Sequence, residues 1–219
     1  RLLCPAAIFF RDGEVCEDCL GKAIPLPGVM HGCYRGDKAA SGVVAAMLSA
    51  HRLRGTWHNA IDRYIMLTEF ARQKFIGAGY KPEQLVVKPN FLNEDPGYRE
   101  GTGDYMVFFG RLTIEKGAKT LLKAWTKVNP EIPLKMIGEG DLQAELEQFV
   151  AQNNLTNVEI LGRKPREETL KIVKGAAAFV FPSQWYEGLP MTIIEAFACG
   201  VPVIGSKLGA AATVIEERK

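Results

Sequence analysis

The sequence YMVFFGRLTIEKG, residues 105–117, decides the fold, because a short apolar run passes directly into a polar loop bounded by Gly110 and Gly117. Similar apolar runs, rich in Val, Ile and Phe as a set, recur at 134–137, 158–161, 176–181 and 201–204. Short uninterrupted apolar runs are typical of strands that are buried on both faces of a parallel sheet. We therefore predict five such strands between residue 105 and the end of the chain.

The segments between these runs have the apolar spacing of helices. One face carries Leu121, Leu122, Trp125 and Val128, and the helix after 134–137 has a second apolar face made of Leu142, Leu146, Phe149 and Val150. Leu170 and Val173 mark a third helix, and Pro190 is expected at the first helical position of a fourth. Strands that alternate with helices in this way predict a doubly wound α/β domain with a parallel sheet.

The first ninety residues have a less regular alternation of apolar runs and helical patterns. We expect an Ala-rich helix over 38–54, a strand at 64–67, a helix capped by Thr68, and a strand at 85–88. This pattern predicts the closing part of a second α/β domain at 1–89, followed by a polar, glycine-rich linker at 90–104 and the main domain at 105–219. Because the chain opens on Arg1 and ends before a final strand, we expect a fragment in which both domains are incomplete.

The composition excludes several classes of protein. The 219 residues are 47% hydrophobic and 24% charged, with a net charge of +2, so no strong field marks a nucleic-acid binder. No stretch approaches the roughly 18 apolar residues that span a bilayer, and no signal peptide is visible. We expect a cytoplasmic protein, with association at a membrane surface left open. No G-x-G-x-x-G follows the first predicted strand, which argues against a nicotinamide cofactor.

The loop at 110–117 carries the first candidate chemistry. Ligands of open α/β sheets bind at the carboxyl ends of the strands, where Gly110 lies. Arg111 offers a planar fork of donors and Lys116 a compact cation, and together they suit a diphosphate. The alternative is that they are two surface cations that flank a turn.

The second candidate stretch is PSQWYEGLPMTIIEAFACG, residues 182–200. Glu187 lies in its loop, and Glu195 lies eight residues later inside a helix whose N-terminus is a ready anion site. Gly188 permits close approach of a ligand to the backbone. Helix capping explains an acid near a helix start, but Glu195 stands among apolar residues and needs a partner, such as a ribose diol. The neighbouring Trp185 and Tyr186 belong either to a sugar pocket or to the core.

These motifs together resemble the large retaining glycosyltransferase family of GT-B fold known as family 4, or glycosyl transferases group 1. The E-x7-E motif of that family matches Glu187 and Glu195, and its phosphate-binding Arg and Lys match Arg111 and Lys116. Its GEG turn matches residues 138–140. The stretches CPAAIFFRDGEVCEDCLG and LTEFARQKF resemble the end of the family's acceptor-side domain.

The resemblance implies a role for each matched residue. Glu195 would bind the nucleotide ribose, while Glu187, Gly188 and Leu189 would meet the donor sugar and diphosphate. Gly110 and the Gly138–Glu139 turn complete the binding set, and Glu187, Arg111 and Lys116 form the catalytic set. The implied reaction transfers a hexosyl group from a nucleoside diphosphate sugar with retention of configuration and without a metal ion. The acceptor stays open among polysaccharide precursors, lipid-linked saccharides and small molecules, and we expect residues 1–219 alone to be inactive.

The cysteines form a separate motif. Cys4, Cys16, Cys19 and Cys33 give the spacing C-x11-C-x2-C-x13-C. In a reducing compartment, four such thiols suit a structural tetrahedral zinc ion, although free cysteines are also common in cores. Two alternative functions follow from these patterns: a catalytically inactive nucleotide-sugar-binding module of the same fold, and a zinc-organised interaction module centred on residues 1–35.

Overall fold

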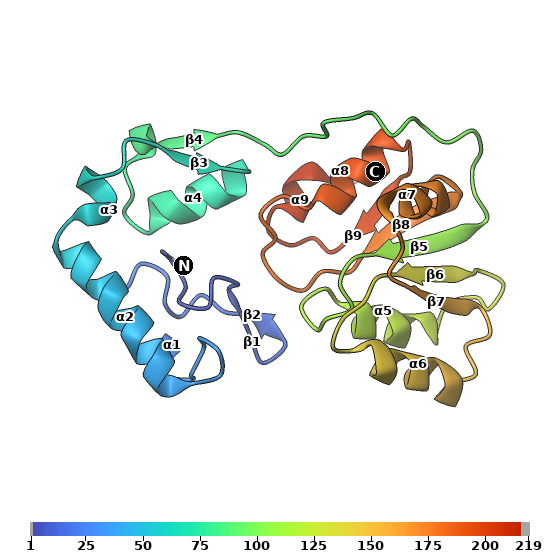
Figure 1. The fold of residues 1–219 in the computed structure, drawn as a ribbon, viewed down its shortest axis with the longest axis horizontal. Coiled ribbons are helices and arrows are strands. Elements are labelled where there is room, and N and C mark those ends of the chain that lie inside the picture. The colour runs from blue at the N-terminus through green and yellow to red at the C-terminus, as the bar shows by residue number, and fades with distance from the viewer. Residues whose placement is uncertain (1, 216–219) are drawn as a thin grey trace. The chain divides into compact units, whose positions relative to one another are not determined.

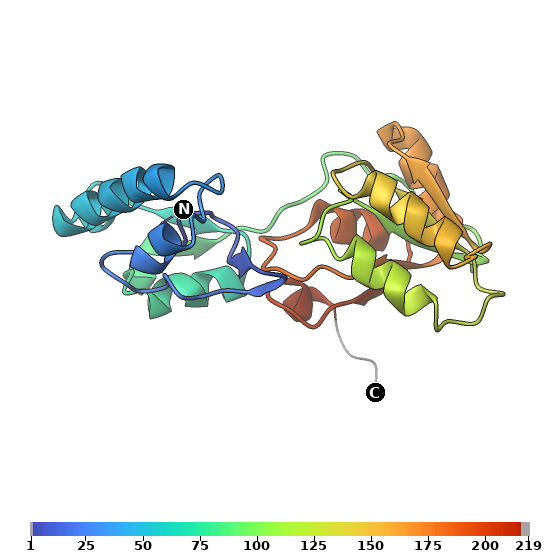
Figure 2. The ribbon, with the colours of Figure 1, turned by 90° about the horizontal axis from the view of Figure 1, so that it is seen from below.

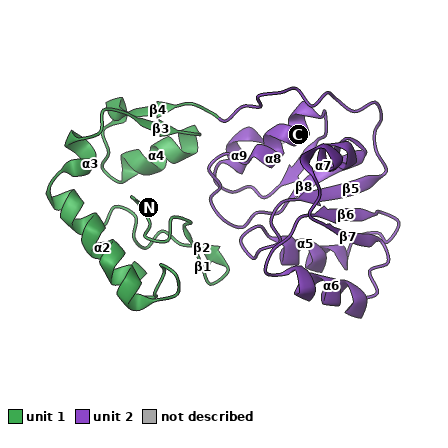
Figure 3. Ribbon diagram, viewed as in Figure 1, with its two compact units in different colours: residues 1–89 green, residues 90–219 purple. Residues whose placement is uncertain are grey.

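The computed structural model describes residues 2–215. They form two compact units that divide between Pro89 and Asn90 (Figure 3). Residues 216–219, the end of the domain predicted at 105–219, lie outside the described residues, as does Arg1.

The second unit is built on a five-stranded sheet in which every neighbouring pair is parallel. Its strands are β5 (Tyr105–Phe109), β6 (Leu134–Ile137), β7 (Val158–Gly162), β8 (Ala176–Phe181) and β9 (Val203–Gly205), in the order β7-β6-β5-β8-β9. The predicted α/β class with a parallel sheet is confirmed. Because the chain moves outward from β5 to β7 and then returns to β8 on the other side of β5, the sheet has a topological switch point between β5 and β8.

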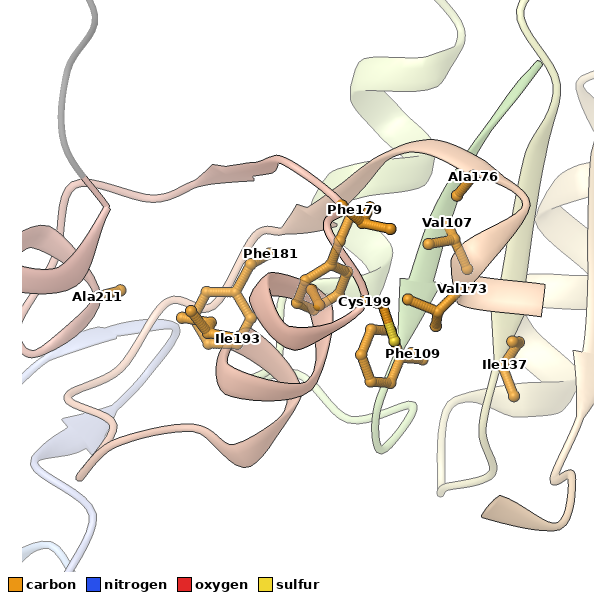
Figure 4. Packing of buried hydrophobic residues seen from close by; sticks show 12 residues of the cluster. Val107, Phe109, Ile137, Val173, Ala176, Phe179, Phe181, Ile193, Cys199 and Ala211 are labelled. Atoms are coloured by element: carbon orange, nitrogen blue, oxygen red, sulfur yellow. The ribbon is translucent and has the colours of Figure 1, made fainter. Parts of the chain in front are cut away.

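Helices cover both faces of this sheet (Figure 1). On one face α5 (Ala118–Trp125) and α6 (Gln143–Gln152) pack against Phe108 and Met136. On the other face α7 (Arg166–Lys174), α8 (Met191–Ala198) and α9 (Ala211–Val214) pack against Val107 and Phe109, as Figure 4 shows for part of that core. Successive residues of β5 therefore point into opposite cores, which explains why the whole run is apolar.

Three local details differ from the prediction. The last strand starts at Val203 and not at Val201, since the Val201 N–H closes the end of α8 on Ala196 and Pro202 has no N–H to offer a ladder. Pro190 is the extended residue that precedes α8 and not its first helical residue. Val128 follows the end of α5 but still packs against the core that α5 covers.

The segment at 90–104 has no helix or strand, but it is not a free tether. The Arg99 N–H donates to the Cys199 carbonyl at 3.0 Å, and the Arg99 guanidinium donates to the Ala176 and Ala177 carbonyls at 2.7 and 3.2 Å. A side chain at Gly103 would overlap the Ala176 backbone, with a Cβ only 2.3 Å from its carbonyl carbon. The segment is thus packed within the second unit.

The first unit contains a parallel pair, β3 (Tyr64–Met66) with β4 (Leu85–Val87), and the helices α2 (Lys38–Leu53), α3 (Thr56–Asn59), α4 (Glu69–Gly77) and the short 3-10 turn η1 (Pro82–Gln84). As predicted, the Thr68 hydroxyl caps α4 by accepting from the Ala71 N–H at 3.2 Å. The segment before α2 holds only a hairpin of β1 (Phe10–Arg11) and β2 (Glu14–Val15) and a short α1 (Leu26–Met30). Figure 2 shows these elements from a second side. Of the helices that the structure describes, none combines the length and the apolar character needed to cross a bilayer.

Candidate functional site

Glycines allow the backbones of the loops that follow β5 and β6 to pack closely against each other. A Cβ on Gly138 would lie 1.8 Å from the Gly110 carbonyl oxygen, and one on Gly140 would lie 2.5 Å from the Leu112 carbonyl oxygen. The Gly110 N–H donates to Ile137 and the Leu112 N–H donates to Glu139, at 3.0 and 2.9 Å. The GEG turn is therefore required for backbone packing, and it places Glu139 beside the start of the 110–117 loop.

The loop that follows β8 packs against the other end of the 110–117 loop. Gly117 has φ of 74°, and a Cβ there would lie 2.0 Å from the Pro182 carbonyl oxygen. The Gln184 N–H donates to the Glu115 carbonyl at 2.9 Å. Since β5 and β8 flank the switch point of the sheet, both loops lie at the edge where open α/β sheets bind ligands.

Lys116 and Glu187, 71 residues apart in sequence, form an ion pair between these two loops. The Lys116 Nζ lies 2.6 Å from Glu187 Oε1, and only 20% and 8% of the two side chains are exposed. The Ser183 hydroxyl donates to the same Glu187 oxygen at 2.9 Å, and Lys116 lies over the Trp185 ring, 5.5 Å from its centroid. A shielded pair of this kind keeps one cation and one carboxylate in a fixed geometry at the sheet edge.

Arg111 is arranged differently. Its guanidinium donates to Glu115 Oε1 at 3.1 Å, within the same loop, and 63% of its side chain is exposed. An exposed pair this loose contributes little to stability, so the guanidinium is free to turn toward a bound anion.

Glu195 projects from the second turn of α8 and meets Arg166, the first residue of α7. The Arg166 Nε and the Arg166 Nη2 both lie 3.2 Å from Glu195 Oε1, and 15% of the Glu195 side chain is exposed. The two atoms share one carboxylate oxygen, so these contacts leave the other oxygen for a further donor. Sequence reasoning expected a partner for Glu195 but missed Arg166, because nothing in the local spacing links residues 29 positions apart.

A cavity of ≈290 Å³ lies at this edge, and it is lined by residues from the ends of three strands and from α7 and α8. Its walls include Gly110, Arg111, Gly138, Glu139, Arg163, Lys164, Thr169 and Thr192. Arg163 donates to Glu139 at 3.0 Å. A larger cavity of ≈690 Å³ is lined mainly by apolar residues and by Arg99, whose guanidinium is held by backbone carbonyls. The smaller cavity is therefore the better match for an anionic ligand.

The remaining predicted site residues, Gly188 and Leu189, lie in the loop that precedes α8. Gly188 is exposed, whereas Leu189 is buried and its carbonyl accepts from the Asn90 side-chain amide at 2.9 Å. Asn90 is a positioning residue that the sequence did not reveal, since it lies 99 residues from its partner. No side chain of the described residues caps the α8 N-terminus; the Ile193 N–H bonds to the Pro190 carbonyl at 3.2 Å, and the N–H groups before it stay available to a ligand.

The predicted metal ligands lie in the first unit. Cys4, Cys16, Cys19 and Cys33 are free thiols, and Cys199 is a fully buried thiol in the core of the second unit. Within residues 2–215, no three His, Cys, Asp or Glu side chains are arranged as a formed metal site. The zinc ion therefore stays a prediction, which is taken up below.

The family of the chain follows from sequence comparison. The sequence model described as "Glycosyl transferases group 1" matches residues 93–219, which is more than half of the chain, so the chain belongs to that family. An uncharacterized glycosyltransferase of Methanocaldococcus jannaschii, MJ1178, is 29% identical over 154 residues, covering 70% of this chain and 42% of the relative. The D-rhamnosyltransferase WbpZ of Pseudomonas aeruginosa is 32% identical over 120 residues, covering 54% and 31%.

Solved structures show the same fold. Anabaena Alr3699/HepE in complex with UDP and glucose matches with a TM-score of 0.65 at 19% identity, covering 88% of this chain and 65% of that one. Staphylococcus aureus TarM, solved with UDP and saccharides, matches with a TM-score of 0.65 at 21% identity, covering 77% and 34%. The fold is thus of the GT-B glycosyltransferase type. The chain spans less than half the length of the curated relatives named above.

Proposed function

We propose that the second unit binds a nucleoside diphosphate sugar, and that the protein transfers the sugar to a saccharide acceptor with retention of configuration, as a family 4 enzyme. One observation carries this proposal. The loops after β5 and β8, on either side of the switch point, place two cations and a shielded carboxylate next to an uncapped helix N-terminus. The names of the relatives, a rhamnosyltransferase among them, and the UDP and glucose in Anabaena Alr3699/HepE support a hexosyl donor.

The diphosphate is assigned to Arg111, Lys116 and the first N–H groups of α8. A guanidinium and an ammonium neutralise the two phosphates, and the helix N-terminus adds about half a positive charge. Charge accumulates on the diphosphate as the bond to the sugar breaks, so cations fixed in advance stabilise the transition state more than the ground state. We propose that these groups supply the stabilisation of the leaving group from the protein itself.

The ribose is assigned to Glu195 and to the neighbouring cavity of ≈290 Å³, which is lined by Thr192, three residues before Glu195 on α8. With one carboxylate oxygen held by Arg166, the other is free to accept from a ribose hydroxyl. The donor sugar is assigned to Glu187 and the backbone of Gly188 and Leu189. Glu187 is bonded to Lys116 and Ser183, which holds it beside a cation that is assigned to the diphosphate.

Lys116 gives a direct test of this proposal. In calorimetric titrations of the 219-residue chain with UDP, GDP, ADP and CDP, we expect one-to-one binding of at least one nucleotide. The substitution Lys116→Met should weaken that binding about tenfold to a hundredfold, because a hydrogen bond to a charged group contributes ~1.5–3 kcal/mol. The matched control is Lys119→Met, since Lys119 is paired with Glu145 on the surface of α5 and α6.

The control variant should bind as the wild type does. If none of the four nucleotides binds, or if both substitutions weaken binding equally, the donor site proposed here is wrong. Differential scanning calorimetry of both variants checks that a loss of binding does not reflect unfolding.

A further inference from the structure

The segment before α2 is unusual in its backbone. Residues 2–37 contain two strands of two residues and one helix of five. Four of the five described non-glycine residues with positive φ lie here, with φ between 49° and 68°, at Ala7, Phe9, Asp12 and Arg35. Each such residue costs roughly 1 kcal/mol or more, and the cost is tolerated only where the surroundings fix the backbone.

Apolar packing inside the segment is sparse, although Leu3, Phe9 and Leu20 also pack into the core of the first unit. The buried residues of the described stretch are few and mostly small: Leu3, Pro5, Cys19, Pro25, Gly28 and Gly32. Its larger apolar side chains include three that are more than half exposed: Ile24, Leu26 and Met30. Small segments without a core are commonly held by disulfides or by a metal ion, and all four cysteines here are free thiols.

The four cysteines are gathered around Gly28. A Cβ on Gly28 would lie 3.4 Å from the Cys19 sulfur and 2.9 Å from Cγ of Pro5, the neighbour of Cys4. The Gly28 carbonyl accepts from the Cys33 N–H at 2.9 Å. Cys16 directly precedes the turn that contains Cys19, in which the Leu20 N–H bonds to the Glu17 carbonyl at 2.8 Å. The absence of a side chain at Gly28 thus lets three separate stretches of chain approach one another.

The electrostatics of the thiols agree with this proximity. Burial raises the pKa of Cys19, a hydrogen bond from the Gly28 N–H opposes the shift, and the thiols of Cys4, Cys33 and Cys16 add to it. Burial likewise raises the pKa of Cys33, with a further contribution from Cys4, while Arg11 opposes it. Arg11 therefore lies beside the group of thiols, where Asp18 at 2.9 Å and Asp12 at 3.4 Å balance part of its charge. A complex of four thiolates with one divalent ion carries a net negative charge, which such a cation would stabilise.

We propose that Cys4, Cys16, Cys19 and Cys33 bind one structural zinc ion. Zinc is the common divalent ion that takes four thiolates tetrahedrally, with Zn–S distances of about 2.3 Å. Because the described side chains are not arranged as a formed site, binding includes a movement of the four sulfurs onto one point and releases their protons to solvent. The ion holds the strained turns of residues 2–37 together. This site lies in the first unit and does not depend on the proposed donor site.

The zinc content of the purified chain tests the proposal. We expect elemental analysis of the 219-residue chain, prepared without added metal or chelator, to find about one zinc ion per chain. A mercurial reagent should release that zinc as it titrates the thiols, and Cys19→Ser should lose it. The control is Cys199→Ala, which removes a buried thiol of the second unit and should keep the zinc.

A second measurement covers the case in which Cys19→Ser does not fold. Cobalt(II) added to the metal-free wild-type chain should give the intense charge-transfer and visible bands of tetrahedral thiolate coordination, and zinc should displace them. The proposal is overturned if the chain binds neither ion while its thiols are reduced. It is also overturned if mass measurement finds the four cysteines joined in disulfides.

Discussion

At the scale of single residues, the two acids of the E-x7-E motif have different surroundings. Glu187 is shielded and bonded to Lys116 and Ser183, whereas Glu195 is bonded to Arg166. Their spacing alone could not distinguish a sugar ligand from a ribose ligand. We propose that Glu195 binds the ribose, which the free nucleotide and the sugar donor have in common.

Isosteric substitution of the two acids separates these roles. Glu195→Gln should weaken both nucleoside diphosphate and donor, about tenfold to a hundredfold, because one charged hydrogen bond contributes ~1.5–3 kcal/mol. Glu187→Gln should leave the affinity for free nucleoside diphosphate nearly intact. It should weaken only the affinity for the nucleoside diphosphate sugar. Calorimetry with both ligands measures this difference. Equal losses of nucleotide affinity in the two variants would contradict the assignment.

Sequence reasoning named Arg111, Lys116, Glu187 and Glu195 as candidate site residues because they lie in the loops that follow two strands or in the helix after the second loop, where the local pattern is informative. It did not find Arg166 as the partner of Glu195, Ser183 as a partner of Glu187, or Asn90 as the partner of the Leu189 carbonyl. Arg166 and Asn90 reach the site through tertiary contacts across 29 and 99 residues of sequence, and Ser183 is a loop hydroxyl with no distinctive local signal. The pairing of Lys116 with Glu187 was likewise invisible, although both residues were named.

At the scale of elements, the five strands of the second unit were predicted within one or two residues, because a sheet buried on both faces requires uninterrupted apolar runs. The short hairpin of β1 and β2 was not predicted. One error lies at Val201–Pro202, where Pro202 has no N–H to pair, and the other at Pro190, whose ψ of 124° is extended and places it before the helix. The close approach of Gly117 to Pro182 could not be predicted, since it depends on how two loops from different strands pack. Glycines that are required for space look identical in sequence to those required only for a turn.

Gly117 and Gly162 give a matched pair that separates these two requirements. Both have left-handed backbones, with φ of 74° and 65°, but a Cβ on Gly117 would overlap the Pro182 carbonyl, whereas a Cβ on Gly162 meets nothing within 4 Å. Gly162→Ala should cost roughly 1–2 kcal/mol from the backbone alone. Gly117→Ala should cost about 1–3 kcal/mol more through overpacking.

Thermal unfolding of the two variants measures the difference. Each kcal/mol corresponds to about 2–4 °C in a chain of this size, so Gly117→Ala should have the clearly lower melting temperature. It should also lose nucleotide binding, because the loop that carries Lys116 can no longer pack on the loop that carries Glu187. Similar melting temperatures for the two variants would show that the two loops do not depend on this contact.

At the scale of the whole molecule, the chain divides into two units with different organisation. The second unit has two continuous cores and contains every residue assigned to the donor. The first unit has a small core around Leu3, Met66, Tyr80 and Leu85 together with the cysteine-rich segment. The sequence indicated two regions with different patterns, but it could not reveal the acceptor, because no pattern in residues 2–89 matches a specific acceptor.

Hydrogen exchange with and without the nucleotide that binds most tightly tests the central claim most directly. We expect amide protection in the three loops at 110–117, 138–142 and 182–192 and in the first turns of α8, with residues 2–89 exchanging at unchanged rates. Protection confined to these loops is the result expected if the donor site lies at the carboxyl edge of the second sheet. Saturating nucleotide that leaves these loops unprotected, or that protects the first unit instead, would contradict it.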